Sequence, residues 1–160
     1  MRLTTRTNLA LRTLMVCAVN PERIVRKSDV ALAINASENH LAQVVNQLGN
    51  AGFITTLRGR HGGFVLARPA DQISVGAVFR AFEAELPFME CMTDENTCPL
   101  KGVCRMSVHL TAAVEAFYAT LDPVLLSDLT DCNEGLAAIL SMDSIARLAD
   151  QARCAQRAVA

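Results

Sequence analysis

Three cysteines lie close together in the second half of the chain. Cys91, Cys98 and Cys104 fall within fourteen residues, in a segment that is polar and rich in turn formers. Pro99 and Gly102 break any regular element between the second and third thiol. Such a loop can bring three sulfur atoms to one point, and thiolates are soft ligands that suit iron–sulfur clusters, zinc or copper(I). The spacing therefore predicts a soft-metal site.

The composition favours a cytosolic chain in which thiols stay reduced. Its 160 residues predict one domain, with at most an appended element. The sequence contains no run of eighteen apolar residues, and its N-terminus lacks the apolar run of a signal peptide. We therefore expect a cytoplasmic protein with no membrane partner. Six cysteines in that compartment favour metal or redox chemistry over a disulfide framework.

The charge is divided unevenly along the chain. Residues 1–80 contain ten Lys and Arg but only four Asp and Glu, a net charge of +6. Residues 81–160 contain five basic and twelve acidic residues, a net charge of −7. A basic half joined to an acidic half suggests a polyanion-binding face beside a regulatory or assembly part.

Two short helices joined by a tight turn are predicted after a first helix over residues 7–19. Ser28 and Ser37 are candidate N-caps for the two helices. Apolar residues recur at helical spacing in the second one, at Leu41, Val44, Val45 and Leu48. This is the helix-turn-helix pattern. The outward face of the second helix carries amide and imidazole groups that can bond base edges, and Asn and Gln suit adenine; they are Asn39, His40, Gln43, Asn46 and Gln47.

A basic, glycine-rich turn follows between two β-prone runs, residues 53–57 and 64–67. It predicts a hairpin that would form the wing of a winged helix. The turn lacks the Gly-Lys-Ser/Thr ending of a nucleotide-binding loop. We expect double-stranded DNA to be contacted by three groups of residues: Arg2, Thr4 and Arg6 near the first helix; Ser37, Asn39, His40, Gln43 and Asn46 on the second half of the helix-turn-helix; Arg58, Arg60 and His61 on the wing.

The second half of the chain is predicted to be helical around the cysteine loop. Ser74 is a candidate N-cap for a helix, and a longer helix should run from after Cys104 to about Asp122. That helix has an apolar stripe typical of paired helices, at Met106, Leu110, Ala113/Val114, Phe117 and Leu121. We therefore expect a homodimer, which would match a palindromic DNA site.

The expected fold is mainly α with a small β-hairpin wing. It divides into a winged helix-turn-helix over residues 1–83, a cysteine loop over 84–104, a dimerisation helix with a short following helix over 105–131, and a C-terminal extension over 132–160. We expect Cys17 to be a small core residue. Cys132 and Cys154 are predicted to be thiols without a ligand role.

Over about residues 1–140 the chain resembles the winged-helix iron–sulfur transcriptional regulators of the NsrR, IscR and RirA type. The resemblance rests on the three-cysteine loop and on Thr4-x-x-Thr7-Asn8-x-Ala10-Leu11-Arg12, Val45-x-x-Leu48-x-x-Ala51-Gly52 and Arg58-Gly-Arg-x-Gly-Gly63. Residues 73–80 and the spacing of the cysteines are most similar to the nitric-oxide-sensing members. This resemblance implies a homodimer with an iron–sulfur cluster on Cys91, Cys98 and Cys104 of each subunit, expected as a 4Fe–4S rather than a 2Fe–2S cluster.

The same resemblance implies a repressor that releases DNA when nitric oxide nitrosylates its cluster. The fourth ligand departs from the family pattern. Asn8 stands where nitric-oxide sensors supply an Asp from the partner subunit, and Ser107 stands where IscR has a His. Regulators of the RirA type also carry Asn at the first of these positions, so an iron- or cluster-status-responsive regulator is the alternative. Further options for the fourth ligand are His109, Asp94 and Glu95, or a position with no protein ligand.

Other chemistries remain possible for the same residues. Cys91, Cys98 and Cys104 with His109 could hold structural zinc, and the three thiols alone could form a cluster-free redox switch. A thiol enzyme is not supported, because no Cys–His pairing is apparent in the sequence. We therefore expect a regulator and not an enzyme.

Overall fold

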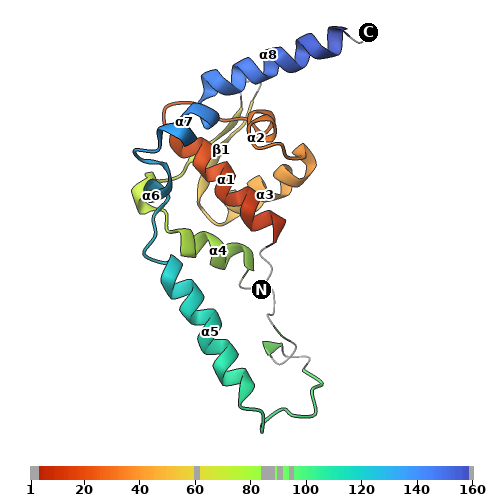
Figure 1. The fold of residues 1–160 in the computed structure, drawn as a ribbon, viewed down its shortest axis with the longest axis vertical. Helices are drawn as coiled ribbons and strands as arrows, with labels where there is room; N and C mark the ends of the chain where they lie inside the picture. Colours follow the sequence, from red (N-terminus) through yellow and green to blue (C-terminus); the bar gives the residue numbers. More distant parts are fainter. Residues whose placement is uncertain (1–3, 60–61, 84–88, 90–91, 94–95, 159–160) are drawn as a thin grey trace.

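The part of the chain that the structure describes is mainly helical, with one two-stranded antiparallel sheet, as the sequence predicts (Figure 1). The computed structural model describes residues 4–59, 62–83, 89, 92–93 and 96–158. Six residues singled out from the sequence lie outside these ranges: Arg2, Arg60, His61, Cys91, Asp94 and Glu95. None of the described helices is long and apolar enough to cross a membrane.

The first three helices form the helix-turn-helix and its support. They are α1 (Thr5–Val19), α2 (Lys27–Ala33) and α3 (Glu38–Asn50). Helix α3 follows Ser37 as predicted, although the Ser37 side chain makes no capping hydrogen bond. The prediction that Ser28 is an N-cap is wrong: α2 begins at Lys27, and the Arg26 N–H donates to Asp29 Oδ2 at 3.0 Å. An acidic side chain in the first turn thus caps this helix instead of a hydroxyl.

The helical stripe predicted for α3 faces the core. Leu41, Val44 and Leu48 are fully buried, while Val45 is half-buried. They pack with Ala10 and Leu14 of α1 in the main hydrophobic cluster. Burial of aliphatic side chains at this spacing, at about 1.5–3 kcal/mol each, fixes which face of α3 remains outside.

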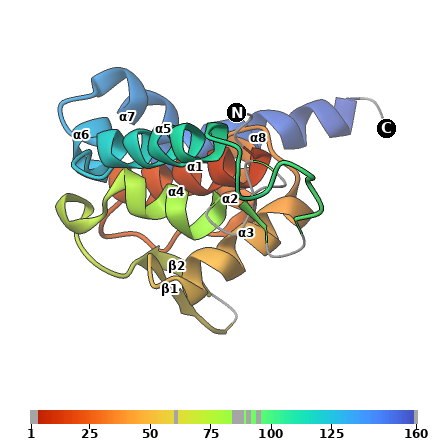
Figure 2. The ribbon, with the colours of Figure 1, turned by 90° about the horizontal axis from the view of Figure 1, so that it is seen from below.

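The wing is a hairpin of β1 (Ile54–Leu57) and β2 (Gly63–Leu66). The strands are antiparallel, with Ile54 opposite Leu66. The segment between α1 and α2 anchors this hairpin, because Val25 N donates to Phe64 O at 3.0 Å and Phe64 N donates to Val25 O at 2.9 Å. Figure 2 shows α3 and the hairpin on one side of the molecule, with α5 and α8 on the other.

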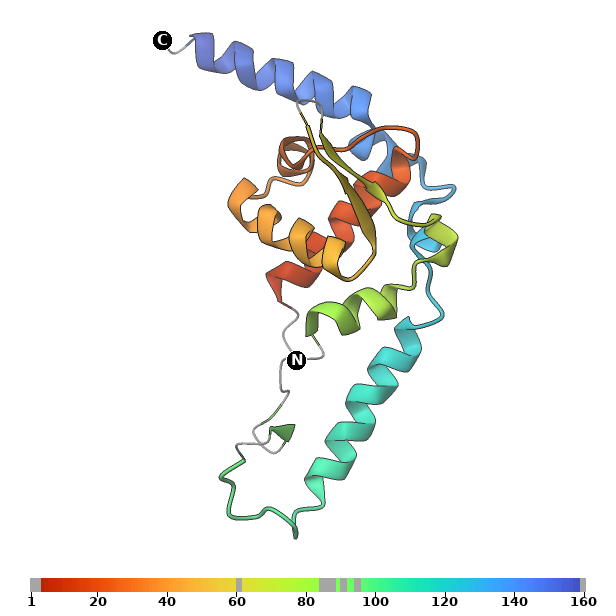
Figure 3. The same cartoon turned by 180° about the vertical axis from the view of Figure 1, so that it is seen from behind.

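The remaining elements among the described residues are a 3-10 turn, η1 (Ala70–Gln72), and five helices. The helices are α4 (Val75–Glu83), α5 (Met106–Leu121), α6 (Leu126–Thr130), α7 (Glu134–Leu140) and α8 (Met142–Ala158). The predicted N-cap of α4 is confirmed, because Ala77 N donates to Ser74 Oγ at 3.2 Å. In Figure 3, α5 projects from one end of the body and α8 from the other.

The start of the predicted C-terminal extension belongs to the main core. Leu140 and Ile145 are buried in the same hydrophobic cluster as α1 and α3. The buried Asn20 side chain joins this segment to α1: its Nδ2 donates to Leu140 O at 2.9 Å, and its Oδ1 accepts from Met142 N at 2.9 Å. A buried amide that satisfies both backbone partners fixes where α7 ends and α8 begins.

Helix α5 is fixed to α4 near its C-terminal end. Arg80 donates to Asp122 Oδ2 at 2.9 Å and to Glu115 Oε1 at 3.0 Å, and its guanidinium lies 4.4 Å from the Tyr118 ring centroid. Three residues of the predicted dimer stripe pack against α4 of the same chain rather than facing outward: Val114, Phe117 and Leu121. Periodicity identified an apolar face of α5 but not the surface that covers it.

Gly76 allows this close approach, and replacing it should loosen the α4–α5 joint. A Cβ at Gly76 would collide with the Asp122 carboxylate and lie 2.6 Å from Asp122 N. We expect Gly76→Ala to lower the free energy of unfolding by about 1–3 kcal/mol, the usual cost of overpacking. Urea denaturation measures this change.

Gly49→Ala is the matched control, because a Cβ there meets only Thr56 Cγ2 at 3.9 Å. In a helix, alanine is more favourable than glycine by about 1 kcal/mol, so this variant should be as stable as the wild type or more stable. Equal stability of the two variants would contradict the tight fit at Gly76.

Candidate metal centre and DNA-binding surface

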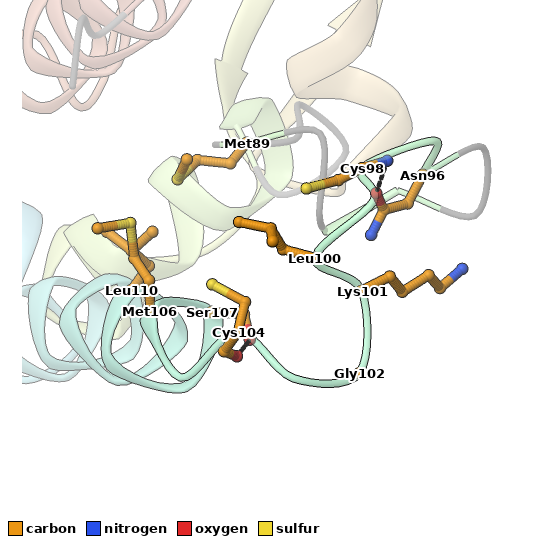
Figure 4. Close-up of a pocket in the computed structure, with 10 residues that line it drawn as sticks. All are labelled: Met89, Asn96, Cys98, Leu100, Lys101, Gly102, Cys104, Met106, Ser107 and Leu110. Carbon is orange, nitrogen blue, oxygen red and sulfur yellow. Dashed lines mark hydrogen bonds between the residues drawn. The ribbon is translucent and has the colours of Figure 1, made fainter.

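Two of the three predicted cysteine ligands face the same hollow. Cys98 and Cys104 are free thiols that line a cavity of about 300 Å³, together with Met89, Leu100 and Leu110. Figure 4 shows both sulfur atoms pointing into the space between these apolar side chains. Cys91, the third predicted ligand, lies outside the described residues. The structure thus brings together the two predicted ligands whose positions it describes.

Short backbone turns fold the loop toward this hollow. Cys98 N donates to Asn96 Oδ1 at 2.9 Å, and Lys101 N donates to Cys98 O at 3.1 Å. Cys104 N then donates to Leu100 O at 3.0 Å, and Gly102 has a φ of 90°, which glycine adopts without strain. The turn formers seen in the sequence therefore make the bends that return Cys104 to the cavity.

The donors in this pocket fit an iron–sulfur cluster. Thiolates are the usual protein ligands of such clusters, and the two sulfur atoms share a largely apolar pocket. Among the described residues, no group of three His, Cys, Asp or Glu side chains could hold a metal ion. The pocket therefore provides two ligands of the predicted set, and its third, Cys91, is not described.

The candidates for a fourth ligand lie in different surroundings. Ser107 lines the cavity, and its hydroxyl donates to Cys104 O at 3.2 Å. His109 is exposed on α5 and is not among the residues that line the cavity. Asn8 is exposed on α1 and does not line the cavity of its own chain.

The residue that ends α4, Glu83, joins the beginning of the cysteine loop to α1. Its Oε1 accepts from Thr4 N at 2.9 Å, from Thr4 Oγ1 at 2.7 Å and from Thr7 Oγ1. Burial raises the pKa of the Glu83 carboxyl, but the hydrogen bonds from Thr7 and Thr4 outweigh it and bring the pKa below its ordinary value. Glu83 is therefore held as a carboxylate that fixes the first turn of α1.

Helix α3 is tied to the same end of α4. Gln47, predicted on the outward face of α3, is half-buried, and its Nε2 donates to Ala81 O at 2.9 Å. The contacts of Gln47 and Glu83 join residues 34 and 79 positions apart. Local patterns in the sequence give no signal for such pairs.

Most residues predicted to contact DNA are exposed. Thr4 differs, because it is half-buried and its hydroxyl bonds Glu83. Arg6 Nη2 donates to Gln43 Oε1 at 3.4 Å, so the start of α1 borders the outer face of α3. The exposed residues are Arg6, Ser37, Asn39, His40, Gln43, Asn46 and Arg58. They lie on α1, on α3 and at the end of β1, and α3 and the hairpin share one side of the molecule (Figure 2).

Two other cysteines lie away from this cavity. Cys17 is buried in the main core as predicted, and burial raises the pKa of its thiol to about 12. A thiol with that pKa is almost wholly protonated near neutral pH and reacts poorly. Cys132 is exposed in the turn before α7.

Known proteins match this chain over most of its length. Residues 3–132 match the family model Rrf2, described as an iron-dependent transcriptional regulator. A transcriptional regulator named NsrR from Geobacillus kaustophilus is 40% identical over 142 residues, covering 88% of this chain and 97% of the relative. A repressor named NsrR from Streptomyces coelicolor is 39% identical over 137 residues, covering 84% and 92% of the two chains.

Solved structures share the fold. CymR of B. subtilis, described as its global cysteine regulator, matches with a TM-score of 0.61 and 28% identity, over 81% of this chain and 96% of CymR. IscR of T. potens matches with a TM-score of 0.64 and 23% identity, over 81% and 85% of the two chains, and supports the fold alone. With its winged helix, exposed α3 face and match over residues 3–132, the chain belongs to the Rrf2 family: it is a DNA-binding transcriptional regulator and not an enzyme.

Proposed function

We propose that this chain is a cytoplasmic, homodimeric repressor that loses its affinity for DNA when nitric oxide reacts with an iron–sulfur cluster held by Cys91, Cys98 and Cys104. The observation that carries this proposal is the cavity into which the Cys98 and Cys104 sulfurs point. The two relatives near 40% identity are named NsrR, one of the regulator types that the sequence resembles. Nitric oxide as the effector follows from that resemblance. When bound, the cluster supplies iron that can take up nitric oxide. The chain's own residues hold that site and link it to DNA.

The link from the cysteine loop to DNA runs through the end of α4. Glu83 holds the first turn of α1, which carries Arg6, and Ala81 holds α3 through Gln47. A change in the shape of the loop would alter both contacts, because Glu83 directly precedes the loop in the sequence and Ala81 lies two residues before Glu83. In a dimer the two recognition helices must match half-sites about one helical turn apart, so a small reorientation lowers affinity.

Glu83→Ala should uncouple the loop from the DNA-binding surface. The ratio of operator affinities of the cluster-loaded and cluster-free proteins, which in coupled systems is roughly 5–150, should fall toward one. Glu83→Gln keeps an acceptor oxygen for Thr4 and Thr7 and should retain more of the ratio. Fluorescence anisotropy at fixed salt measures these affinities.

Asp143→Ala is the control for this series, because it removes an exposed carboxylate that pairs with Arg23 at 3.1 Å, away from the loop. This variant should behave like the wild type. A wild-type ratio in Glu83→Ala would show that coupling does not pass through this contact.

The exposed face of α5 is the proposed dimer interface. Val108 is 69% exposed, and Ala112, Ala116 and Ala119 are exposed on the same face at helical spacing. Small and apolar residues in such a stripe let two helices pack closely. The opposite face already packs on α4. The proposed fourth ligand is Asn8 of the partner subunit, so it requires an assembly of two subunits. Homodimerisation through this stripe would provide that assembly.

Val108→Asp should convert the dimer to a monomer. An unpaired charge buried at an interface costs about 3–5 kcal/mol, so the dimer dissociation constant should rise by roughly 100-fold or more. Analytical ultracentrifugation measures this. Ile139→Asp makes the same change at a residue of α7 that is 59% exposed, and it should leave the dimer intact. If Val108→Asp sediments as the wild type, this face of α5 is not the interface.

Anaerobically purified protein should absorb near 400 nm, bind its operator, and lose binding after stoichiometric nitric oxide. Zinc at the same thiols would give a colourless protein, and a cluster-free redox switch would contain no iron or sulfide. Each substitution at the loop, Cys91→Ser, Cys98→Ser or Cys104→Ser, should abolish the absorption, the iron and sulfide content and the response to nitric oxide.

Cys132→Ser and Cys154→Ser are controls for thiol loss outside the loop, and both should keep the cluster. Retention of the cluster in the loop variants would refute the ligand assignment. The same assay separates the second candidate, an iron- or cluster-status-responsive regulator, which Asn8 favours over a sensor with Asp at this position. That regulator would release DNA on iron chelation and stay bound in nitric oxide.

A further inference from the structure

We infer that Arg6 orients the Gln43 side chain as a hydrogen-bond donor, so that this pair reads guanine and not adenine. The inference rests on the proposed use of the outer face of α3 in the major groove. It changes the expectation drawn from residue types alone, in which a glutamine on a recognition helix suits adenine.

The contact between Arg6 and Gln43 has only one possible direction. Arg6 Nη2 lies 3.4 Å from Gln43 Oε1. A guanidinium has donors but no acceptor, so the oxygen of the carboxamide must face Arg6. The two N–H groups of Gln43 Nε2 then point away from Arg6. Both residues are exposed, so these donors remain available to another molecule.

The backbones that carry the pair are held independently of it. Thr4 and Thr7, on either side of Arg6, bond Glu83, while Gln47, one turn after Gln43, bonds Ala81. The end of α4 thus sets the position of α1 relative to α3. Arg6 and Gln43 also border one cavity of about 740 Å³ with His40, on the exposed side of α3. The meeting of Arg6 and Gln43 is therefore built into the packing of three helices.

The fixed amide decides which base edge is complementary. Adenine presents N7 as an acceptor and N6–H2 as a donor, so it needs both the oxygen and the nitrogen of a glutamine. In this pair the oxygen is engaged by Arg6, and the guanidinium charge beside it opposes the approach of another donor. Guanine presents two neighbouring acceptors, O6 and N7, which match the N–H groups of Gln43 and Arg6.

The test compares all four bases at each position of an operator selected from random duplexes. The position read by the pair is the one at which Gln43→Ala erases discrimination. There the wild type should bind guanine roughly tenfold more tightly than adenine, as one good base contact provides. Arg6→Ala frees the amide oxygen and should shift the preference to adenine. Gln43→Glu offers only acceptors and should shift it to cytosine.

Arg23→Ala is the control, because it removes an exposed arginine that pairs with Asp143; it should leave every base preference unchanged. Adenine as the preferred base of the wild type at that position would overturn the inference. So would an Arg6→Ala variant that binds all sequences equally less well, since Arg6 would then contact phosphate only. A wild type that binds no duplex would instead overturn the proposed role of α3 in DNA binding. Failure of that proposal can therefore be told apart from failure of the Arg6–Gln43 inference.

Discussion

The Glu83 carboxylate, at the end of α4 and directly before the cysteine loop, holds the first turn of α1. It accepts three hydrogen bonds from Thr4 and Thr7, and the loop begins at the next residue. Two turns of different helices are therefore positioned by one charged group. Charge-assisted hydrogen bonds are about twice as strong as neutral ones, which suits a contact between the last turn of α4 and the first turn of α1. The position of Arg6 beside Gln43 follows from this contact.

Helix α5 follows the cysteine loop in the chain and holds its other end. Arg80 fixes its C-terminal half with two carboxylates and an aromatic ring, while its N-terminal residues line the cysteine cavity. The loop is thus anchored at one end by Glu83 on α4 and at the other by a helix that α4 also holds. In the proposed function, a change within the loop would act on the rest of the protein through these two attachments.

Features set by neighbours in the sequence could be predicted, whereas features set by distant contacts could not. The buried stripe of α3, the hairpin and the Ser74 cap follow from spacing and local hydrogen bonds, and the structure has them. Gln47 looked like a base-reading residue, because its amide lies on the polar side of α3. Its partner, the Ala81 carbonyl, is 34 residues away and leaves no mark in the periodicity. The apolar stripe of α5 was likewise visible, but its cover by α4 was not.

Asn20 has a consequence for where the folded unit ends. The family match stops at residue 132, yet the hydrophobic cluster continues to Ile145, and the amide of Asn20 is satisfied by the junction of α7 and α8. A chain cut at the family boundary would remove two of the three hydrogen-bond partners of Asn20, leaving the Val16 carbonyl, and would uncover apolar side chains of α1. The smallest stable fragment of this protein is therefore longer than the segment that matches the family model.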